Sequence, residues 1–310
     1  MTPTYDVAVI GAGSAGLQAA LTLGRMRRTV ALLGTDRYRN DPAAAMHNFL
    51  GHDGTPPAAL RTAARNDLDR YPTVETVESE VVDVAGSTGA FVVRTSTGAV
   101  VRARRVLLAT GVADTLPEVP GLADLWGDVV AHCPYCHGFE LADQPVGILG
   151  SDASVPLRAA MLERIASRTV VLTDGSDLDP SVRSDLDRMG VEVRTQPVAG
   201  VVRGRLGIDV ELDGTPSVEL GGLFVGPRWE QAAPFVHRLE LDRSEQGAIL
   251  VDAFGRTSRA GIFAAGDIAQ APGLPMPLAS VLTAAAAGLV AAAACDRELA
   301  ASDHGLLLPA

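Results

Sequence analysis

The hydrophobic residues of this chain repeat one pattern twice. Residues 5–34 begin with an apolar strand, turn at a group of glycines, continue with apolar residues at helical spacing and end in a second apolar strand. Residues 144–175 follow the same order. A strand, a helix and a second strand in this order form two parallel strands with the helix packed over them. The pattern therefore predicts an α/β fold built around two such units, related as distant repeats.

The turn in the first unit has a specific glycine spacing. Gly11, Gly13 and Gly16 directly follow the first apolar run, in the order GxGxxG. The first glycine permits the tight turn, the second lets the backbone approach a pyrophosphate, and the third lets helix and strand pack closely. The N–H groups at the start of the helix, which include Ser14 and Ala15, favour bound negative charge. This segment predicts a dinucleotide site.

Two later segments support that site. The apolar run that starts at Val106 ends at Ala109, Thr110 and Gly111. A second apolar run, within residues 255–270, ends at Gly266 and Asp267, and this carboxylate could accept a hydrogen bond from a ribose or ribityl hydroxyl. An ordinary turn is the alternative interpretation of each segment.

Composition and charge exclude several classes of protein. Hydrophobic residues make up 47% of the 310 residues, enough for a large core, and the net charge of −11 disfavours nonspecific binding to nucleic acid or anionic membranes. Three cysteines do not make a secreted disulfide framework. The first strand pattern starts at Tyr5 and leaves no room for a signal peptide, so we expect a cytoplasmic protein.

An uncharged run from Leu278 to Cys295 approaches the length of a membrane span. Alanine dominates this run, and Pro277 stands just before it, as at the start of a helix. We interpret the run as a buried or subunit-contacting helix and expect no membrane association.

Two cysteines, Cys133 and Cys136, are separated by two residues and flanked by His132 and His137. A structural zinc site needs four ligands, and no second pair of this kind exists in the sequence. The CxxCH pattern of haem attachment is matched, but we expect no export of this chain. A redox-active disulfide remains the favoured interpretation, and no metal site is expected. A thiol at a helix start is more readily ionised.

Together these segments resemble the low-molecular-weight thioredoxin reductases, which are flavoproteins with two dinucleotide-binding domains. The resemblance implies FAD, a likeness over the whole chain and a homodimer. The expected fold is α/β, with two Rossmann-like domains, the second inserted in the first. Residues 1–113 and 244–310 would bind FAD, and residues 114–243 would form a degenerate NAD(P)-type domain that carries the cysteines. By resemblance, Cys136 faces the flavin, Cys133 exchanges with the external sulfur, and His137 is the acid/base, with His132 as the alternative.

The resemblance also assigns FAD contacts to residues along the first domain. They are Gly11, Gly13, Ser14, Ala15, Gly16, Thr35, Asp36, Arg39, Asn40, Asn48, Val82, Ala109, Thr110, Gly111, Gly266, Asp267, Ser280 and Val281. Two positions depart from the family. Gly34 stands where many FAD proteins have an acidic residue at the end of the second strand, so Thr35 or Asp36 would have to replace it. Ala279, Ser280 and Val281 replace an Arg-Gln-Ala segment beside the flavin.

The second glycine turn departs further from the reductases. Asp152 replaces its second glycine, and Val155 stands where a small residue would allow close packing. The following strand ends among Asp174, Asp177 and Asp179, where a reductase has arginines for the 2′-phosphate of NADPH. A negative side chain in this place opposes a pyrophosphate. We therefore expect no NADPH binding.

A narrower resemblance follows from the sequence CPYCHGFE, from residues 47–57 and from the degenerate second turn. These are similar to the FAD-dependent dithiol oxidases of disulfide-containing natural products, of the holomycin and gliotoxin type. The implied reaction oxidises a small dithiol to an intramolecular disulfide through Cys133 and Cys136, with electrons passing to FAD and then to O2 to give H2O2, in antibiotic biosynthesis and self-protection. The alternatives are an NADPH-dependent thioredoxin or disulfide reductase and a non-enzymatic dithiol sensor or sequestering protein.

Overall fold

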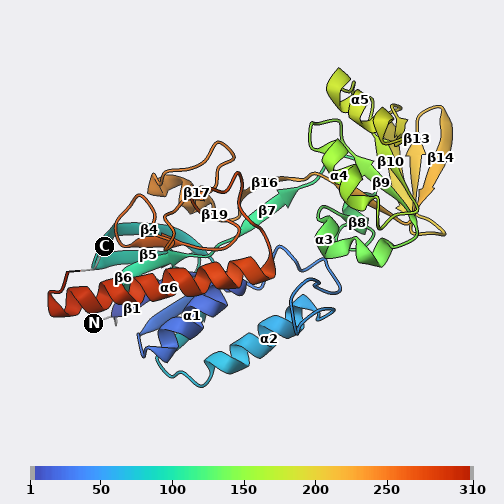
Figure 1. Ribbon diagram of the computed structural model, residues 1–310. Helices are drawn as coiled ribbons and strands as arrows, with labels where there is room; N and C mark the ends of the chain where they lie inside the picture. The colour runs from blue at the N-terminus through green and yellow to red at the C-terminus, as the bar shows by residue number, and fades with distance from the viewer. Residues whose placement is uncertain (1–3, 308–310) are drawn as a thin grey trace. The chain divides into compact units, whose positions relative to one another are not determined.

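A computed structural model describes residues 4–307, and the chain divides into two compact units (Figure 1). The first unit contains the chain up to Arg39, then Ala58–Ala113, and the chain from Trp229 onward. The second unit contains Asn40–Pro57 and Asp114–Arg228.

These limits differ in two places from the predicted insertion at residues 114–243. The second unit ends at Arg228 because Phe235, Val236 and Leu239, just beyond it, are buried in a core of the first unit. The segment Asn40–Pro57 joins the second unit, where the backbone of Gly127 packs directly on Pro42. Neither contact has a local signature in the sequence.

The first unit is built on a seven-stranded sheet. Its strands are β1 (Thr4–Ile10), β2 (Val30–Gly34), β3 (Val74–Glu78), β4 (Val81–Ser87), β5 (Ala90–Thr95), β6 (Val100–Leu108) and β18 (Ile262–Ala264). The order is β3-β2-β1-β6-β5-β4. The early part of β6 pairs antiparallel with β5, and its last residues pair parallel with β18. Strands β1, β2, β3, β6 and β18 are therefore parallel, and their carboxyl ends share one edge.

Side chains alternate between the two faces of this sheet. Val7, Val9 and Leu32 pack on one face with residues of α1 (Ser14–Arg25) and α6 (Val281–His304). Ala8 and Leu33 pack on the other face, above η3 (Pro234–Leu239). Burial of both faces explains why these strands are continuous apolar runs rather than alternating ones.

The alanine-rich segment forms α6, which lies side by side with α1 in the first unit (Figure 1). A Cβ placed on Gly288 would lie 2.1 Å from the carbonyl oxygen of Ala15, so the two helix backbones are in direct contact. Ala291, Ala292 and Cys295 continue the buried face. In residues 4–307, no helix is both long enough and apolar enough to cross a membrane.

The second unit has its own parallel sheet. Its strands are β8 (Val130–Ala131), β9 (Pro145–Leu149), β10 (Arg168–Leu172), β11 (Glu192–Arg194) and β15 (Gly222–Val225), in the order β11-β10-β9-β15-β8. One side is covered by α4 (Val155–Leu162) and α5 (Pro180–Arg188). The other packs against a separate antiparallel sheet of β12 (Val198–Arg203), β13 (Ile208–Leu212) and β14 (Thr215–Leu220).

The remaining elements are short, apart from α2 (Pro57–Leu68). They are β7 (Val112–Thr115), η1 (Ala123–Leu125), α3 (Pro134–His137), η2 (Phe139–Leu141), β16 (Arg228–Gln231), β17 (Ile249–Leu250) and β19 (Ala269–Gln270). β7 and β16, which carry the chain between the units, pair with each other. Both predicted strand–helix–strand units, β1-α1-β2 and β9-α4-β10, are confirmed.

Replacement of Gly288 by leucine should destabilise the first unit. The new side chain must separate α6 from α1, and overpacking of this kind costs about 1–3 kcal/mol or more. Thermal unfolding monitored by circular dichroism measures the change. Ala63→Leu, on the exposed side of α2 in the same unit, is the matched control and should leave the melting temperature nearly unchanged. Equal melting temperatures for the two variants would contradict the direct helix contact.

Candidate functional site

Three distant segments meet at the carboxyl edge of the first unit's sheet. The N–H of Gly11 donates to the carbonyl of Leu33 at 2.7 Å, and the N–H of Ala109 donates to that of Ile10 at 2.7 Å. The N–H of Ala265 donates to the carbonyl of Leu108 at 2.9 Å. The glycine turn, the Thr-Gly segment and the Gly-Asp segment are therefore neighbours at the ends of β1, β6 and β18. Open parallel sheets bind ligands at such an edge.

The glycines of the first turn are required by close backbone contacts. A Cβ on Gly11 would lie 2.1 Å from the oxygen of Ala109, and one on Gly16 would lie 1.7 Å from the oxygen of Gly11. Gly13 is different, because its nearest neighbour would be Tyr38, 4.0 Å away. The Gly13 backbone is thus open to a ligand, as the GxGxxG pattern predicts. It also caps α1 without any side-chain hydrogen bond, which leaves the N–H groups of the first turn available to an anion.

The glycine at the end of β2 has a steric explanation. A Cβ on Gly34 would lie 2.6 Å from the Cβ of Ala12 in the glycine turn, so an acidic side chain cannot occupy position 34. Asp36 is the carboxylate that follows. Arg65 donates to it at 2.8 Å, and this hydrogen bond lowers the pKa of Asp36. Thr35 lies between these two positions.

Two arginines and a tyrosine near Gly13 were not predicted from the sequence. Arg61 and Arg65 lie one turn apart on α2; the guanidinium of Arg61 covers the ring of Tyr38 at 4.1 Å, and Arg65 donates to the Tyr38 hydroxyl at 2.7 Å. Two arginines at i and i+4 are an ordinary pattern of an exposed helix, which is why they gave no signal. Their position next to the glycine turn suits the phosphate and adenosine part of a dinucleotide.

The other two segments contribute polar groups to the same edge. The hydroxyl of Thr110 is buried and has no hydrogen-bond partner within residues 4–307. Arg39 donates to the carboxylate of Asp267 at 2.9 Å, so these two predicted FAD residues are in contact. Gly111 has a φ of +69° and open space around its Cβ position. A buried unpartnered hydroxyl at a ligand edge indicates a bound group.

The remaining predicted FAD residues are more dispersed. Val82 lies on β4, soon after Ser79, whose N–H donates to the carbonyl of Gly34. Ser280 caps α6, its hydroxyl accepting from the N–H of Thr283 at 3.1 Å, and Val281 begins this helix. Asn40 and Asn48 belong to the second unit. The roles of these residues in binding FAD stay predictions.

The open glycine turn, the uncapped helix start, the buried hydroxyl and the nearby arginines provide N–H groups and positive charge for a pyrophosphate. The residues of the first unit therefore fit the FAD that the sequence predicts.

The second unit carries the redox pair. Cys133 and Cys136 form a disulfide across the four-residue helix α3, with Cys133 as its N-cap and Pro134 at its first position. Both cysteines are partly exposed. Gly138 lets the helix end pack against the unit, since a Cβ there would lie 3.1 Å from Cδ1 of Ile165. The predicted disulfide is confirmed.

The two flanking histidines differ in environment. His137 is half-buried, and its Nδ1 is buried with no hydrogen-bond partner in the described part of the chain. Burial is the main cause that lowers the pKa of His137, although the charge of Glu140 acts in the opposite direction. His132 instead stacks on Trp126, with ring centroids 5.7 Å apart. A neutral imidazole next to Cys136 is suited to accept a thiol proton.

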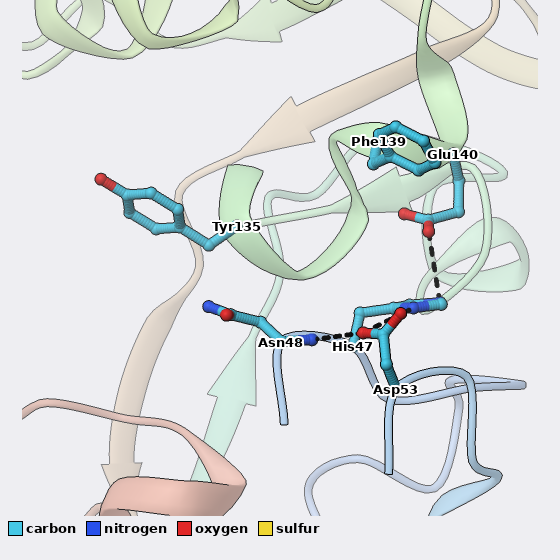
Figure 2. Close-up of a pocket in the computed structure, with 6 residues that line it drawn as sticks. All are labelled: His47, Asn48, Asp53, Tyr135, Phe139 and Glu140. Atoms are coloured by element: carbon cyan, nitrogen blue, oxygen red, sulfur yellow. Dashed lines mark hydrogen bonds and ion pairs between the residues drawn. The ribbon is translucent and has the colours of Figure 1, made fainter. Parts of the chain in front are cut away.

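A pocket of about 420 Å³ lies beside α3 in the second unit. It is lined by His47, Asn48, Asp53, Tyr135, Phe139 and Glu140. Figure 2 shows the His47 ring between two carboxylates, with Nε2 3.3 Å from Glu140 and Nδ1 3.5 Å from Asp53. Of these residues the sequence interpretation singled out only Asn48, whose N–H donates to Asp53 at 2.8 Å and whose φ is +62°.

The second glycine turn carries a negatively charged side chain, that of Asp152. The carboxylate of Asp152 accepts from the N–H of Ser154 at 2.8 Å, directly before α4. Burial opposes the charge of Asp152, but the hydrogen bonds from Ser154 outweigh it and lower the pKa of this carboxyl. Asp152 thus places a negative charge in the turn just before α4, where it opposes a pyrophosphate at the helix start.

The acidic residues after β10 have structural roles. Asp174 accepts from the N–H of Val198 at 2.7 Å, and Asp179 caps α5 by accepting from the N–H of Ser181 at 2.8 Å. Both carboxylates are therefore held in place in the region where a reductase has arginines.

The third cysteine takes no part in the site. Cys295 is buried in α6, and this burial raises the pKa of its thiol well above the ordinary range. In the described residues, no group of three or more His, Cys, Asp and Glu side chains is arranged to hold a metal ion.

Comparison with known proteins agrees with this geometry. Residues 5–288 match the family described as pyridine nucleotide-disulphide oxidoreductase. The thioredoxin reductase aclD of Aspergillus oryzae is 34% identical, and the match covers 96% of this chain and 98% of that protein.

Two crystal structures are similar over nearly their whole length. An oxidoreductase from Agrobacterium tumefaciens is 36% identical with a TM-score of 0.88, covering 96% of this chain and 99% of the other. HlmI is 36% identical with a TM-score of 0.91, covering 98% of this chain and 96% of the other. The predicted resemblance to thioredoxin reductases is confirmed, and the chain belongs to the FAD-binding pyridine nucleotide-disulphide oxidoreductase family.

Proposed function

We propose that this protein is an FAD-dependent dithiol oxidase that converts a small-molecule dithiol to its intramolecular disulfide. The observation that carries the proposal is the contrast between two sites in the second unit. The disulfide of Cys133 and Cys136 is intact beside His137, whereas the nicotinamide-type turn carries the carboxylate of Asp152. A carboxylate in that turn opposes the pyrophosphate of NADPH, which favours thiols as the source of electrons for the redox pair.

The first step is attack of one substrate thiolate on the sulfur of Cys133. A mixed disulfide forms, and Cys136 leaves as a thiolate. The second thiolate of the substrate then attacks the substrate's first sulfur, which is bonded to Cys133 in the mixed disulfide. The product therefore carries the new S–S bond, and Cys133 is released as a thiolate. The substrate loses two electrons and two protons, and the cysteine pair gains the two electrons. His137 accepts a substrate proton at its ring nitrogen and makes the attacking thiolate.

When bound, FAD supplies the two-electron acceptor that reoxidises the cysteine pair and passes the electrons to O2 as hydrogen peroxide. The first unit would hold it through the open turn at Gly13 and the start of α1. The similarity to HlmI supports this function, as does the resemblance of the sequence around the cysteine pair to natural-product dithiol oxidases.

An NADPH-dependent disulfide reductase is the second candidate. The family's name and the thioredoxin reductase aclD favour it. Asp152 at the start of α4 and the absence of arginine among residues 173–179 weigh against it.

We also propose a homodimer that uses the outer side of α6. Leu282, Leu289 and Val290 are exposed on this helix at spacings that place them on one side. An exposed apolar stripe of this kind suits a subunit contact.

Cys136→Ser should keep its FAD but lose reduction of that FAD by dithiol. Serine cannot form the disulfide, so the anaerobic rate of flavin reduction should fall by about three orders of magnitude or more. Stopped-flow absorbance of the flavin measures the rate. Cys295→Ala is the matched control and should react like the wild type. Undiminished reduction in Cys136→Ser would mean that the cysteine pair is not on the electron path.

His137→Gln should change the pH dependence of flavin reduction. A histidine with a lowered pKa is neutral at all pH values above that pKa, so the wild-type rate should stay level near neutrality and fall only below about pH 6.5. Without this base, the rate should follow the substrate's thiolate fraction and rise about tenfold per pH unit up to about pH 8.5.

The matched control for that profile is His132→Gln, which should keep the level region. If the rate of flavin reduction stayed independent of pH near neutrality in His137→Gln, the base would be a different residue. The same would follow if only His132→Gln lost this pH-independent region.

A further inference from the structure

The pocket beside the redox helix has a chemical character that bears on the substrate. Tyr135 lies between the two cysteines in the sequence, and Phe139 and Glu140 follow on the next turn. The opposite wall comes from residues 47–53 of the same unit. A dithiol that reaches Cys133 has this pocket next to it.

Both carboxylate side chains that line the pocket are negatively charged, and no lysine or arginine balances them. Glu140 and Asp53 are carboxylates, and none of the six lining residues is lysine or arginine. The His47 ring is held between the two carboxylates (Figure 2). An anionic substrate group here would meet like charge, and the protein's net charge of −11 adds to the repulsion.

The aromatic side chains point to the same preference. Tyr135 is 72% exposed and Phe139 is 82% exposed, which is unusual for rings of this size. Aromatic faces carry negative potential and attract cations and flat N–H-bearing groups. With the Asn48 amide they form a surface for a neutral or cationic planar group, but they offer nothing to a carboxylate.

We propose that this pocket selects dithiols without a carboxylate, and that Glu140 and Asp53 exclude acidic ones. The proposal rests on the proposed dithiol oxidase function and adds the charge class of its substrate. It excludes glutathione-like thiols as efficient reductants and favours uncharged or cationic dithiols.

The test compares dihydrolipoamide with dihydrolipoate, using the FAD-loaded protein. The two have the same dithiol and differ only in a distant carboxamide or carboxylate, so their sulfur chemistry is matched. At low salt and about pH 8.5, we expect dihydrolipoamide to have a kcat/KM roughly fivefold higher, as one wet like-charge contact implies. Glu140→Gln should bring the ratio close to one.

Taking the ratio of two substrates in one variant cancels any effect of the substitution on His137 or the cysteines. Asp53→Asn is a second variant and should also lower the ratio. Asp213→Asn removes an equal charge from the exposed turn between β13 and β14 and should leave the ratio unchanged.

Equal values of kcat/KM in the wild type, or an unchanged ratio in both pocket variants, would overturn this inference and leave the oxidase function standing. If neither dithiol reduced the flavin, the proposed function and this inference would fail together.

Discussion

Close backbone contact at the carboxyl edge of the first sheet is the constraint on which the dinucleotide site depends. Gly11 lies against Ala109 and Gly16 lies against Gly11, with no room for a Cβ at either position. The same crowding fixes Gly34 against Ala12 and Gly288 against Ala15. The contact of Gly16 with Gly11 tightens the turn itself, and the other three contacts join different segments. Glycine at these positions therefore lets the ends of β1, β2 and β6 and the last helix meet around one ligand-binding edge.

The second unit repeats the strand–turn–helix framework with different chemistry at its turn. In the first unit the helix start has no capping side chain and is available to an anion. In the second, the carboxylate of Asp152 lies in the turn and accepts from the N–H of Ser154, directly before α4. The two turns therefore differ in charge, while the buried strands β9 and β10 hold the second unit together as β1 and β2 hold the first. The cysteine pair on α3 is then the unit's reactive centre.

Much of this structure could be predicted from the sequence because its signals are local. The apolar runs, the glycine spacing and the alanine-rich helix each lie within one short segment. The pair of Arg39 and Asp267 and the steric need for Gly34 depend on tertiary contacts, so the sequence identified these positions without explaining them. Asp179 was interpreted only as a charge that opposes a 2′-phosphate, although its position before Pro180 also has the local signature of a helix start.

The pocket was missed for the same reason. His47 reaches Glu140 only because residues 40–57 fold onto the second unit, which no periodicity indicates. The limit of the second unit at Arg228 likewise depends on where Phe235 is buried. Side chains that act in groups assembled from distant segments are visible only once the fold is known.

The source of the electrons tests the central claim most directly. The FAD-loaded protein is mixed without oxygen with excess NADPH and, separately, with a small reduced dithiol, and the flavin absorbance is followed. The account predicts bleaching by the dithiol alone, with hydrogen peroxide formed when air is readmitted. Rapid bleaching by NADPH would contradict it and would show that Asp152 does not exclude the nicotinamide cofactor.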